Sequence, residues 1–426
     1  MKKYGEMTVA PDAIWFTSIP SSWRATQMRE LFSERNVKVS DKDYAPLSVG
    51  KMGVVPQLET AVKTDNGDNR KLICTGDFAI NSRSDRKGSC GISEYDGSCS
   101  LIITVLKPHN TLNGRFYHYL LRSHYFSEEY YRNGKGLVSD LWTTKWDEMR
   151  NIYIPVPPRS EQDQIVRYLD YKTAKIDKLI SGYKRQIELL EERKRSFVFC
   201  AVTKGLSASS VKSSDIYWLD YVPANWKTKS IAQLCCEVKC KNTGMIEDNL
   251  LSLSYGTIKQ RNINATEGLL PESFEGYNII EENDIVLRLT DLQNDHKSLR
   301  TGISKERGII TSAYLTIRNK SDNNAEYIQL FLHAFDLAKG FYNIGASGVR
   351  QCLNWDIIKT LKILIPPIEE QKRIVSAIKA EYQRIEKSKE EIHKQIELLQ
   401  EYRTRLISDV VTGQIDVRDE VIPEMR

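Results

Sequence analysis

The second half of this sequence repeats the first at a fixed distance along the chain. A Pro-Pro step followed by Glu-Gln and Ile-Val returns with the same internal spacing, and so does the run Gln-Ile-Glu-Leu-Leu. The offset is the same for both patterns (366 − 157 = 209 and 395 − 186 = 209). We therefore expect two tandem copies of one fold that form a pseudo-dimer within one chain, an arrangement suited to reading two half-sites on a duplex. The repeated residues are Pro157, Pro158, Glu161, Gln162, Ile165 and Val166, which return as Pro366, Pro367, Glu370, Gln371, Ile374 and Val375.

Length and composition indicate a multidomain, soluble protein. A chain of 426 residues predicts two to three domains. The sequence contains no apolar run of the roughly 18 residues that a membrane span needs. The charged N-terminus has no apolar stretch behind it and does not resemble a signal peptide. We expect a cytoplasmic protein without membrane association.

The cysteines and histidines indicate no metal site. The only cysteine grouping is Cys235, Cys236 and Cys240, with no histidine nearby and no second pair at zinc spacing. The six histidines do not form His-Glu-x-x-His or another close ligand pattern. We expect the eight cysteines to be reduced and mostly buried.

Motifs for catalysis are missing as well. No Gly-x-x-x-x-Gly-Lys-Ser/Thr phosphate loop occurs, which argues against autonomous ATP-driven work. The Pro-Pro steps follow Val156 and Ile365, so they lack the asparagine of the amino-methyltransferase motif. The net charge of +5 and the pI near 8.6 permit nucleic-acid binding without demanding it. We expect no catalytic residues, no metal and no cofactor bound by this chain.

Alternation of apolar and turn residues predicts an α+β fold with two tandem β-rich domains, each followed by a long helix. The run 100–106 has the β-branched character of a buried strand, and a short helix is expected around 116–122. Ser160 is a suitable N-cap for the first long helix. The expected segments are a first β-rich domain at 1–156, a central helix at 157–207, a second β-rich domain at 208–365, a distal helix at 366–414 and a tail at 415–426.

Both long helices carry a largely apolar stripe at alternating spacings of four and three residues, which is typical of a coiled-coil seam; Lys194 interrupts the first stripe, and Lys389 and Arg403 interrupt the second. A stripe that is narrow, sustained and present twice favours pairing of the two helices, running antiparallel. The alternative is an amphipathic helix that packs only on its own domain. A helix from 160 to 204 would be roughly 65 Å long and could act as a ruler. The seam residues are Ile176, Ile180, Tyr183, Ile187, Leu190 and Phe197 in the first helix, and Ile385, Ile392, Ile396, Leu399 and Leu406 in the second.

Polar, basic loops between the strands are the candidate binding elements. Arginine and glutamine can make paired hydrogen bonds to guanine and adenine, whereas lysine and glycine amides suit phosphates. Ordinary solvated loops are the alternative. Occurrence of such loops at matching places in both copies favours a shared function. The candidates are Lys51, Arg83, Arg86, Lys87 and Lys135 in the first domain, and Lys259, Gln260, Arg261, Arg288, Arg350 and Gln351 in the second.

Nearly the whole chain resembles the specificity subunits of type I restriction–modification systems. The most specific features are the junctions Ile-Pro-Val-Pro-Pro-Arg-Ser-Glu-Gln at 154–162 and Ile-Leu-Ile-Pro-Pro-Ile-Glu-Glu-Gln at 363–371. The segments Ile-Pro-x-x-Trp at 19–23 and Val-Pro-x-x-Trp at 222–226 are also typical. The second junction lacks the proline two positions before Pro-Pro, a minor departure.

This resemblance implies a non-catalytic DNA reader. Each domain would read one half of a bipartite target in double-stranded DNA, and the antiparallel helices would set the unread spacer. The helices would also recruit two methyltransferase (modification) subunits, and complete enzymes add restriction/translocase subunits. S-adenosylmethionine, ATP and magnesium would bind those partners.

Two other functions are consistent with parts of the sequence. A coiled-coil protein-interaction adaptor without DNA binding would account for the helices, but not for two duplicated domains with basic, divergent loops. A self-sufficient nuclease or methyltransferase would show activity as the purified chain, and the missing motifs argue against it.

Overall fold

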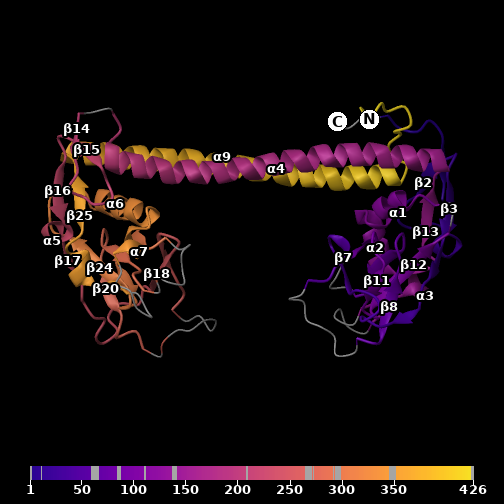
Figure 1. Ribbon diagram of the computed structural model, residues 1–426, viewed down its shortest axis with the longest axis horizontal. Helices are drawn as coiled ribbons and strands as arrows, with labels where there is room; N and C mark the ends of the chain where they lie inside the picture. The colour runs from indigo at the N-terminus through magenta and orange to yellow at the C-terminus, as the bar shows by residue number, and fades with distance from the viewer. Residues whose placement is uncertain are drawn as a thin grey trace. The chain divides into compact units, whose positions relative to one another are not determined.

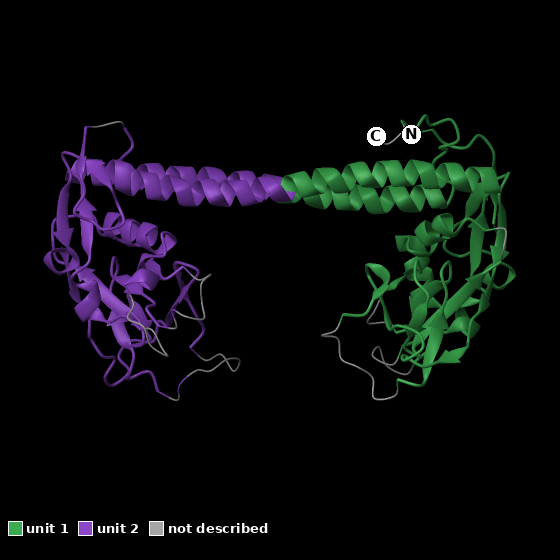
Figure 2. Ribbon diagram, in the orientation of Figure 1, with its two compact units in different colours: residues 1–183, 393–426 green, residues 184–392 purple. Residues whose placement is uncertain are grey.

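A computed structural model describes most of the chain. The residues described are 2–10, 12–58, 67–83, 88–109, 112–136, 142–207, 210–263, 271, 273–290, 292, 299–344 and 352–423. The chain divides into two compact units, and each unit takes part of both long helices (Figure 2). Unit 1 comprises residues 1–183 and 393–426, and unit 2 comprises residues 184–392.

Unit 1 is built on short antiparallel strands with helices packed against them (Figure 1). Its central sheet has the order β10-β9-β12-β4, and smaller pairings join β8 with β11 and β5, β6 with β7, β13 with β3, and β1 with β2. The strands are β1 (Met7–Val9), β2 (Ser18–Pro20), β3 (Arg24–Gln27), β4 (Phe32–Glu34), β5 (Lys38–Val39), β6 (Leu47–Gly50), β7 (Gly53–Pro56), β8 (Arg70–Ile73), β9 (Phe78–Asn81), β10 (Cys90–Ile92), β11 (Gly97–Cys99), β12 (Ile103–Pro108) and β13 (Tyr153–Val156). The helices are η1 (Met28–Glu30), α1 (Gly114–Leu121), α2 (His124–Arg132) and α3 (Trp146–Met149).

Unit 2 repeats this topology. Its central sheet has the order β17-β24-β21-β22, and β20 pairs with β23, β18 with β19, β16 with β25, and β14 with β15. The strands are β14 (Val211–Ser213), β15 (Tyr221–Pro223), β16 (Lys227–Ser230), β17 (Cys235–Glu237), β18 (Leu251–Ser254), β19 (Thr257–Gln260), β20 (Asn278–Ile280), β21 (Ile285–Leu287), β22 (Thr301–Ile303), β23 (Gly308–Ile310), β24 (Leu315–Asn319) and β25 (Lys362–Ile365). The helices are α5 (Ile231–Leu234), α6 (Ala325–Leu337), α7 (Gly340–Asn343) and α8 (Trp355–Ile358).

The core of unit 2 joins buried side chains of the central sheet and α6 with those of both long helices, among them Val198 and Ile374. Tyr117 of α1 and Tyr327 of α6 are both fully buried. The expected helix around 116–122 corresponds to α1. The strand expected at 100–106 begins later, at Ile103, because Leu101 and Ile102 lie exposed in the preceding turn. Position within the turn thus overrides the β-propensity of these two residues.

The repeated Pro-Pro-x-x-Glu-Gln segment makes the junction between sheet and helix. Helices α4 (Arg159–Lys204) and α9 (Ile368–Val411) begin directly after the Pro-Pro steps. The side chain of Gln162 donates to the carbonyl of Pro157 (2.9 Å) and accepts from the amide of Asn113 (3.2 Å). Gln371 makes the equivalent bonds to Pro366 (2.9 Å) and Asn324 (2.9 Å). Ser160 is not the N-cap, since α4 already begins at Arg159.

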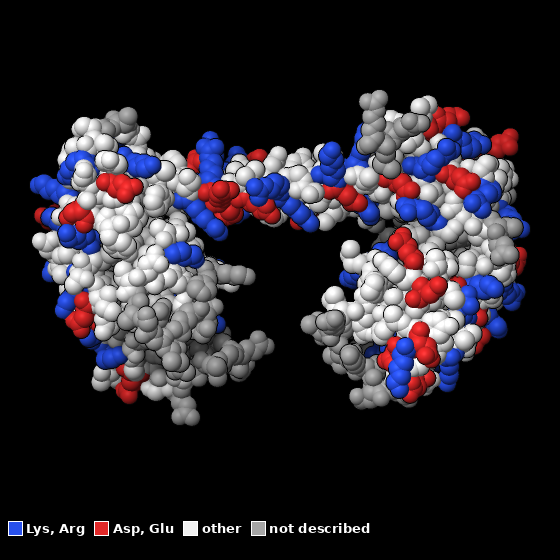
Figure 3. Space-filling view, in the orientation of Figure 1, with Lys and Arg blue, Asp and Glu red and all other residues white. Residues whose placement is uncertain are grey.

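The two long helices pack antiparallel in both units, which confirms the predicted fold class. In unit 1, Arg403 of α9 donates to Asp177 of α4 (3.0 Å). In unit 2, Lys389 pairs with Glu191, and Lys194 donates to Glu386 (2.7 Å). The paired residue on α9 has a lower number each time the residue on α4 has a higher one, and by the same amount, as an antiparallel pair requires. Positive and negative side chains are interspersed along the visible face of the helices (Figure 3).

The predicted seam residues face inward along these helices. Lys194, Lys389 and Arg403, which interrupt the apolar stripes, each form an interhelical ion pair. Cations thus occupy seam positions because carboxylates on the opposite helix neutralise them. The buried seam residues are Ile176, Ile180, Ile385, Ile396 and Leu406, and the half-buried ones are Tyr183, Ile187, Leu190, Phe197, Ile392 and Leu399.

The cysteines are all free, but the expectation that most are buried is wrong. Cys90, Cys99 and Cys235 are buried, whereas three others are exposed. Alternation along β17 places Cys235 in the core and Cys236 outside. Within the described residues, no group of three or more His, Cys, Asp or Glu side chains could hold a metal ion. No helix in the described ranges has both the length and the apolar character to cross a membrane.

Candidate DNA-recognition surfaces

In unit 1, the hairpin β6–β7 exposes Lys51 to solvent, and the side chain of one arginine forms a hydrogen bond to its turn. Lys51 occupies the two-residue turn that follows Gly50. The guanidinium of Arg122, at the end of α1, donates to the carbonyl of Lys51 (2.7 Å) and to the carbonyl of Cys90 on β10. The hairpin is therefore fastened to both the helix and the central sheet.

Close backbone contact reinforces this attachment. A Cβ added to Gly91 would lie 3.0 Å from the Cα of Gly53, so the two strands touch where only glycine fits.

Nearby, the Nδ1 atom of His118 accepts a hydrogen bond from the amide of Ile92 (3.3 Å). Burial, together with the charge of Arg122, lowers the pKa of His118 to about 4. The imidazole is thus neutral at physiological pH and serves as an acceptor.

The structure also brings Arg83 and Lys135 together, although they are far apart in sequence. Thr143 pairs with Arg83 through an antiparallel bridge. It also exchanges two backbone hydrogen bonds with Lys135 (2.8 and 2.9 Å). Both basic side chains are exposed, and Lys135 lies 3.5 Å from Glu148. The two residues thus form one basic edge of unit 1.

In unit 2, the second strand of the hairpin β18–β19 ends in three exposed polar residues, away from the turn. They are Lys259 and Gln260, the last two residues of β19, and Arg261, which follows them. The amide of Arg261 donates to the carbonyl of Leu250 (2.8 Å), which holds the backbone while the side chain stays in solvent. Arg288, directly after β21, is half-buried, and its amide donates to the carbonyl of Arg300 (2.8 Å). The remaining candidates, Arg86, Lys87, Arg350 and Gln351, lie outside the described residues.

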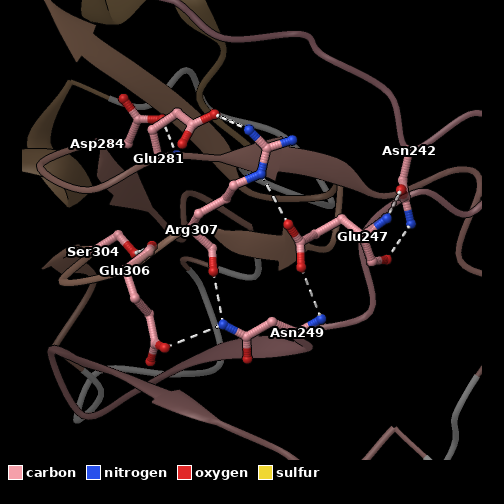
Figure 4. Close-up of polar contacts among 8 residues, drawn as sticks. All are labelled: Asn242, Glu247, Asn249, Glu281, Asp284, Ser304, Glu306 and Arg307. Atoms are coloured by element: carbon pink, nitrogen blue, oxygen red, sulfur yellow. Dashed lines mark hydrogen bonds and ion pairs between the residues drawn. The ribbon is translucent and has the colours of Figure 1, made fainter.

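Cations of the framework have carboxylate partners, as the candidate Lys135 also does, whereas four other candidates have none among the described side chains. Arg307 of unit 2 donates to Glu247 (2.9 Å) and to Glu281 (2.8 Å) within a network of polar side chains (Figure 4). Its pKa is raised, first by the hydrogen bond to Glu247 and then by the charge of Glu281. By contrast, among the residues that the structure describes, no hydrogen bond or ion pair engages the side chains of Lys51, Arg83, Lys259 and Arg261. These four cations are therefore available to an external anion.

The loops recur in the two units, but the individual cations do not. The two-residue turn that holds Lys51 in unit 1 begins with Tyr255 in unit 2. Strand register makes Gly91 of unit 1 equivalent to Gly302 of unit 2. By the same register, Arg288 is the equivalent of Asn81, and Thr290 is the equivalent of Arg83. The backbone pairing of these loops therefore recurs in both units, whereas the side chains that the loops carry differ. Two units of this kind can present different chemistry on one framework.

Two elements of this surface were missed in the sequence. The bracing role of Arg122 has no local signal, because it depends on contact between α1 and a distant hairpin. The exposed turn residue Tyr255 could have been found, since Tyr255-Gly256 separates two short alternating apolar runs. Such a pattern predicts a two-residue hairpin turn.

Sequence comparison identifies relatives of one kind. Residues 223–398 match the family described as "Type I restriction modification DNA specificity domain". A protein named as the type I restriction enzyme MjaX specificity subunit of Methanocaldococcus jannaschii is 20% identical over 432 aligned residues, covering 94% of this chain and 95% of the relative. The MjaVIII specificity subunit of the same organism is 25% identical over 283 residues, covering 63% of each chain.

Solved structures share the fold. A chain from a study of complex assembly and conformational transition of the type I R-M system superposes with a TM-score of 0.68 at 12% identity, covering 93% of this chain and 99% of that one. The HsdS subunit from Thermoanaerobacter tengcongensis superposes with a TM-score of 0.54 at 14% identity, covering 93% and 98%. The tandem domains with long helices are thus a known architecture.

Proposed function

Since the chain belongs to the specificity subunits of type I restriction–modification systems, we propose that it reads a bipartite target in double-stranded DNA. Each unit contacts one half of the target. Cations without carboxylate partners, such as Lys51 and Lys259, bind phosphates and position the unit on the duplex. Arg83, Gln260 and Arg261 reach base edges in the groove.

One observation carries this proposal: the framework is repeated, whereas its exposed side chains are not. Lys51 has Tyr255 at its matched position, and Arg83 has Thr290. Two units that present different side chains in equivalent places would select different base sequences. The target is therefore asymmetric, with two unlike halves.

The paired helices set the number of unread base pairs between the halves. Interhelical ion pairs and the buried seam keep α4 and α9 in one antiparallel register. A rigid pair of fixed length acts as a spacer, because a change in helix length must change the distance that the two halves of the target span.

The helices also recruit two methyltransferase subunits. The repeated Gln-Ile-Glu-Leu-Leu run directs one leucine of each copy away from the seam, and Leu189 is 47% and Leu398 is 50% exposed. Equivalent exposed leucines in the two copies provide two equivalent docking points for identical partners. The chain itself holds no cofactor and performs no catalysis in this proposal. S-adenosylmethionine binds the methyltransferase subunits, and ATP and magnesium bind any restriction subunits.

Mapping methylated bases in the host genome, with and without this gene, tests the proposal. We expect a two-part motif with a constant gap to lose its methylation when the gene is removed. A methylation pattern that does not change, or a continuous motif, would contradict it. Binding of the purified chain to duplex DNA should weaken steeply with salt, as phosphate contacts require, whereas a protein adaptor would show no such binding.

A further inference from the structure

The turn of the β18–β19 hairpin holds a tyrosine in a conformation that tyrosine disfavours. Tyr255 has a φ of 47° and Gly256 a φ of 77°, so both turn residues are left-handed. Glycine accepts this conformation freely, whereas a side chain with a Cβ does not. The ring is nevertheless 75% exposed and thus contributes little to the core. Neither backbone preference nor packing explains a tyrosine at this position.

The surrounding packing holds this turn in place. A Cβ on Gly256 would lie 3.1 Å from the Cβ of Leu299, and one on Gly302 would lie 2.6 Å from Leu253. The hairpin therefore rests on β22 with almost no free space. Tyr255 is presented to solvent from a rigid support, and little conformational freedom is lost if it binds a ligand.

Cationic side chains lie on the hairpin that carries the tyrosine and in the cleft that this hairpin lines. Tyr255 and Arg195 both line a cleft of about 370 Å³, to which Lys194 and Glu191 also contribute. In the described part of the chain, no ion pair engages Arg195. Lys259 and Arg261 extend from the same hairpin. An exposed aromatic ring that shares a hairpin and a cleft with unpaired cations matches the chemistry of a nucleic acid, in which bases stack and phosphates carry negative charge.

The equivalent hairpin of unit 1 also exposes a large apolar side chain. Met52, in the turn of β6–β7, is 87% exposed. This turn too is fixed from behind, by the hydrogen bond from Arg122 to Lys51 and by the contact between Gly53 and Gly91. A braced hairpin with an exposed bulky apolar residue therefore occurs in both units, with a different residue in each.

We propose that Tyr255 is a specificity-determining residue that places its ring against one base step of the DNA half-site read by unit 2. In unit 1 the exposed apolar residue is Met52, which occupies the second position of the equivalent turn, and it contacts the other half-site. Both side chains act as apolar wedges or stacking surfaces, and the adjacent cations bind the flanking phosphates. This inference rests on the proposed DNA-reading function, and it adds the residue that contacts bases from each hairpin.

The test uses the full chain co-expressed with its modification subunit and a duplex carrying the motif that the complex methylates. Tyr255→Asn removes the ring and supplies a residue that tolerates the left-handed conformation. Tyr255→Phe keeps the ring. Met245→Asn is the matched control, because Met245 also has a positive φ (50°) and is 49% exposed in the same unit.

We expect Tyr255→Asn to unfold at the same or a higher temperature than the wild type, yet to bind the duplex roughly tenfold more weakly. Tyr255→Phe and Met245→Asn should bind within about twofold of the wild type. With 2-aminopurine placed at successive positions, one step of a single half-site should lose its fluorescence change in Tyr255→Asn, and Met52→Ala should affect the other half-site.

Undiminished binding by Tyr255→Asn, or equal losses in Tyr255→Phe and Tyr255→Asn, would overturn the assignment of the ring. In that case the wild-type complex would still bind and methylate its motif, so the proposed function would stand. If the wild type binds no DNA at any salt concentration, the proposed function fails and this inference fails with it.

Discussion

The glutamine of the repeated Pro-Pro-x-x-Glu-Gln segment should be a main determinant of stability in each unit. Gln371 is fully buried and makes three hydrogen bonds: it donates to Pro366 (2.9 Å) and Asn323 (2.8 Å) and accepts from Asn324 (2.9 Å). These bonds connect the end of β25, the start of α9 and the start of α6. Replacing Gln371 by alanine therefore separates three elements at one point.

The expected loss of unfolding free energy follows from the backbone groups that the substitution leaves without hydrogen-bond partners. Gln371→Ala removes the partners of two backbone groups, the carbonyl of Pro366 and the amide of Asn324. Each unsatisfied buried group costs about 1–3 kcal/mol, which gives a loss of about 3 kcal/mol as a conservative sum. For a unit of this size the midpoint of thermal unfolding should fall by about 6 to 12 °C.

Calorimetry of the full chain, with hydrogen-exchange mass spectrometry at residues 323–327 and 362–371, measures this effect locally. Gln383→Ala is the matched control, because Gln383 is an exposed glutamine on the same helix and in the same unit. We expect the control to change stability by less than about 0.5 kcal/mol. If Gln371→Ala and Gln383→Ala were equally stable, the junction would not depend on these bonds and the reasoning would be refuted.

Four further predictions concern binding, spacing and pH. Insertion of one heptad after Tyr183 and another after Ile392 lengthens the helix pair by about 10 Å, so the methylated motif should gain about three unread base pairs; genome methylation mapping that returned the original gap would refute the ruler. Arg83→Ala and Arg350→Ala should each weaken binding of the cognate duplex by about 1–3 kcal/mol, and unchanged affinity in fluorescence anisotropy would remove that residue from the recognition surface. Lys259→Ala should lower the slope of log affinity against log salt by about one, while Lys372→Ala, whose cation is paired with Glu369 (2.8 Å), should leave it unchanged. Because burial lowers the pKa of His118 to about 4 from 6.5, the unfolded chain takes up this proton first, so unit 1 should lose stability as the pH falls from about 6.5 to about 4; His118→Gln should flatten this dependence in pH-dependent denaturation, and an unaltered profile would argue against it.

Much of the fold could be predicted because it depends on patterns within short stretches of the sequence, such as the spacing of apolar residues. The seam spacing predicted pairing of α4 and α9, and the Pro-Pro steps marked where both helices begin. Strand register extends the repeat into the sheets, where Gly91 and Gly302 occupy equivalent places. Short strands were harder to locate. Leu101 and Ile102 have strong β-propensity but lie in a turn, because their surroundings decide their conformation.

The candidate recognition residues could be predicted only as a class. Charge and loop position identified Lys51, Arg83 and Lys259, but the same criteria would also select Arg307. Only the structure separates them, because Arg307 is held by two carboxylates from distant parts of unit 2. Long-range pairing of this kind leaves no signal in the local sequence.

By itself, the sequence determined the duplication, the two helices and the residues of their seam, since periodicity and repetition depend only on order along the chain. Tertiary structure decided which exposed groups are free to bind and which are already neutralised. It also decided that equivalent hairpins present Lys51 and Met52 in one unit and Tyr255 in the other. The physical reason is that hydrogen bonds, ion pairs and close glycine contacts join residues that are far apart in sequence, and these contacts select the side chains that remain available for a ligand.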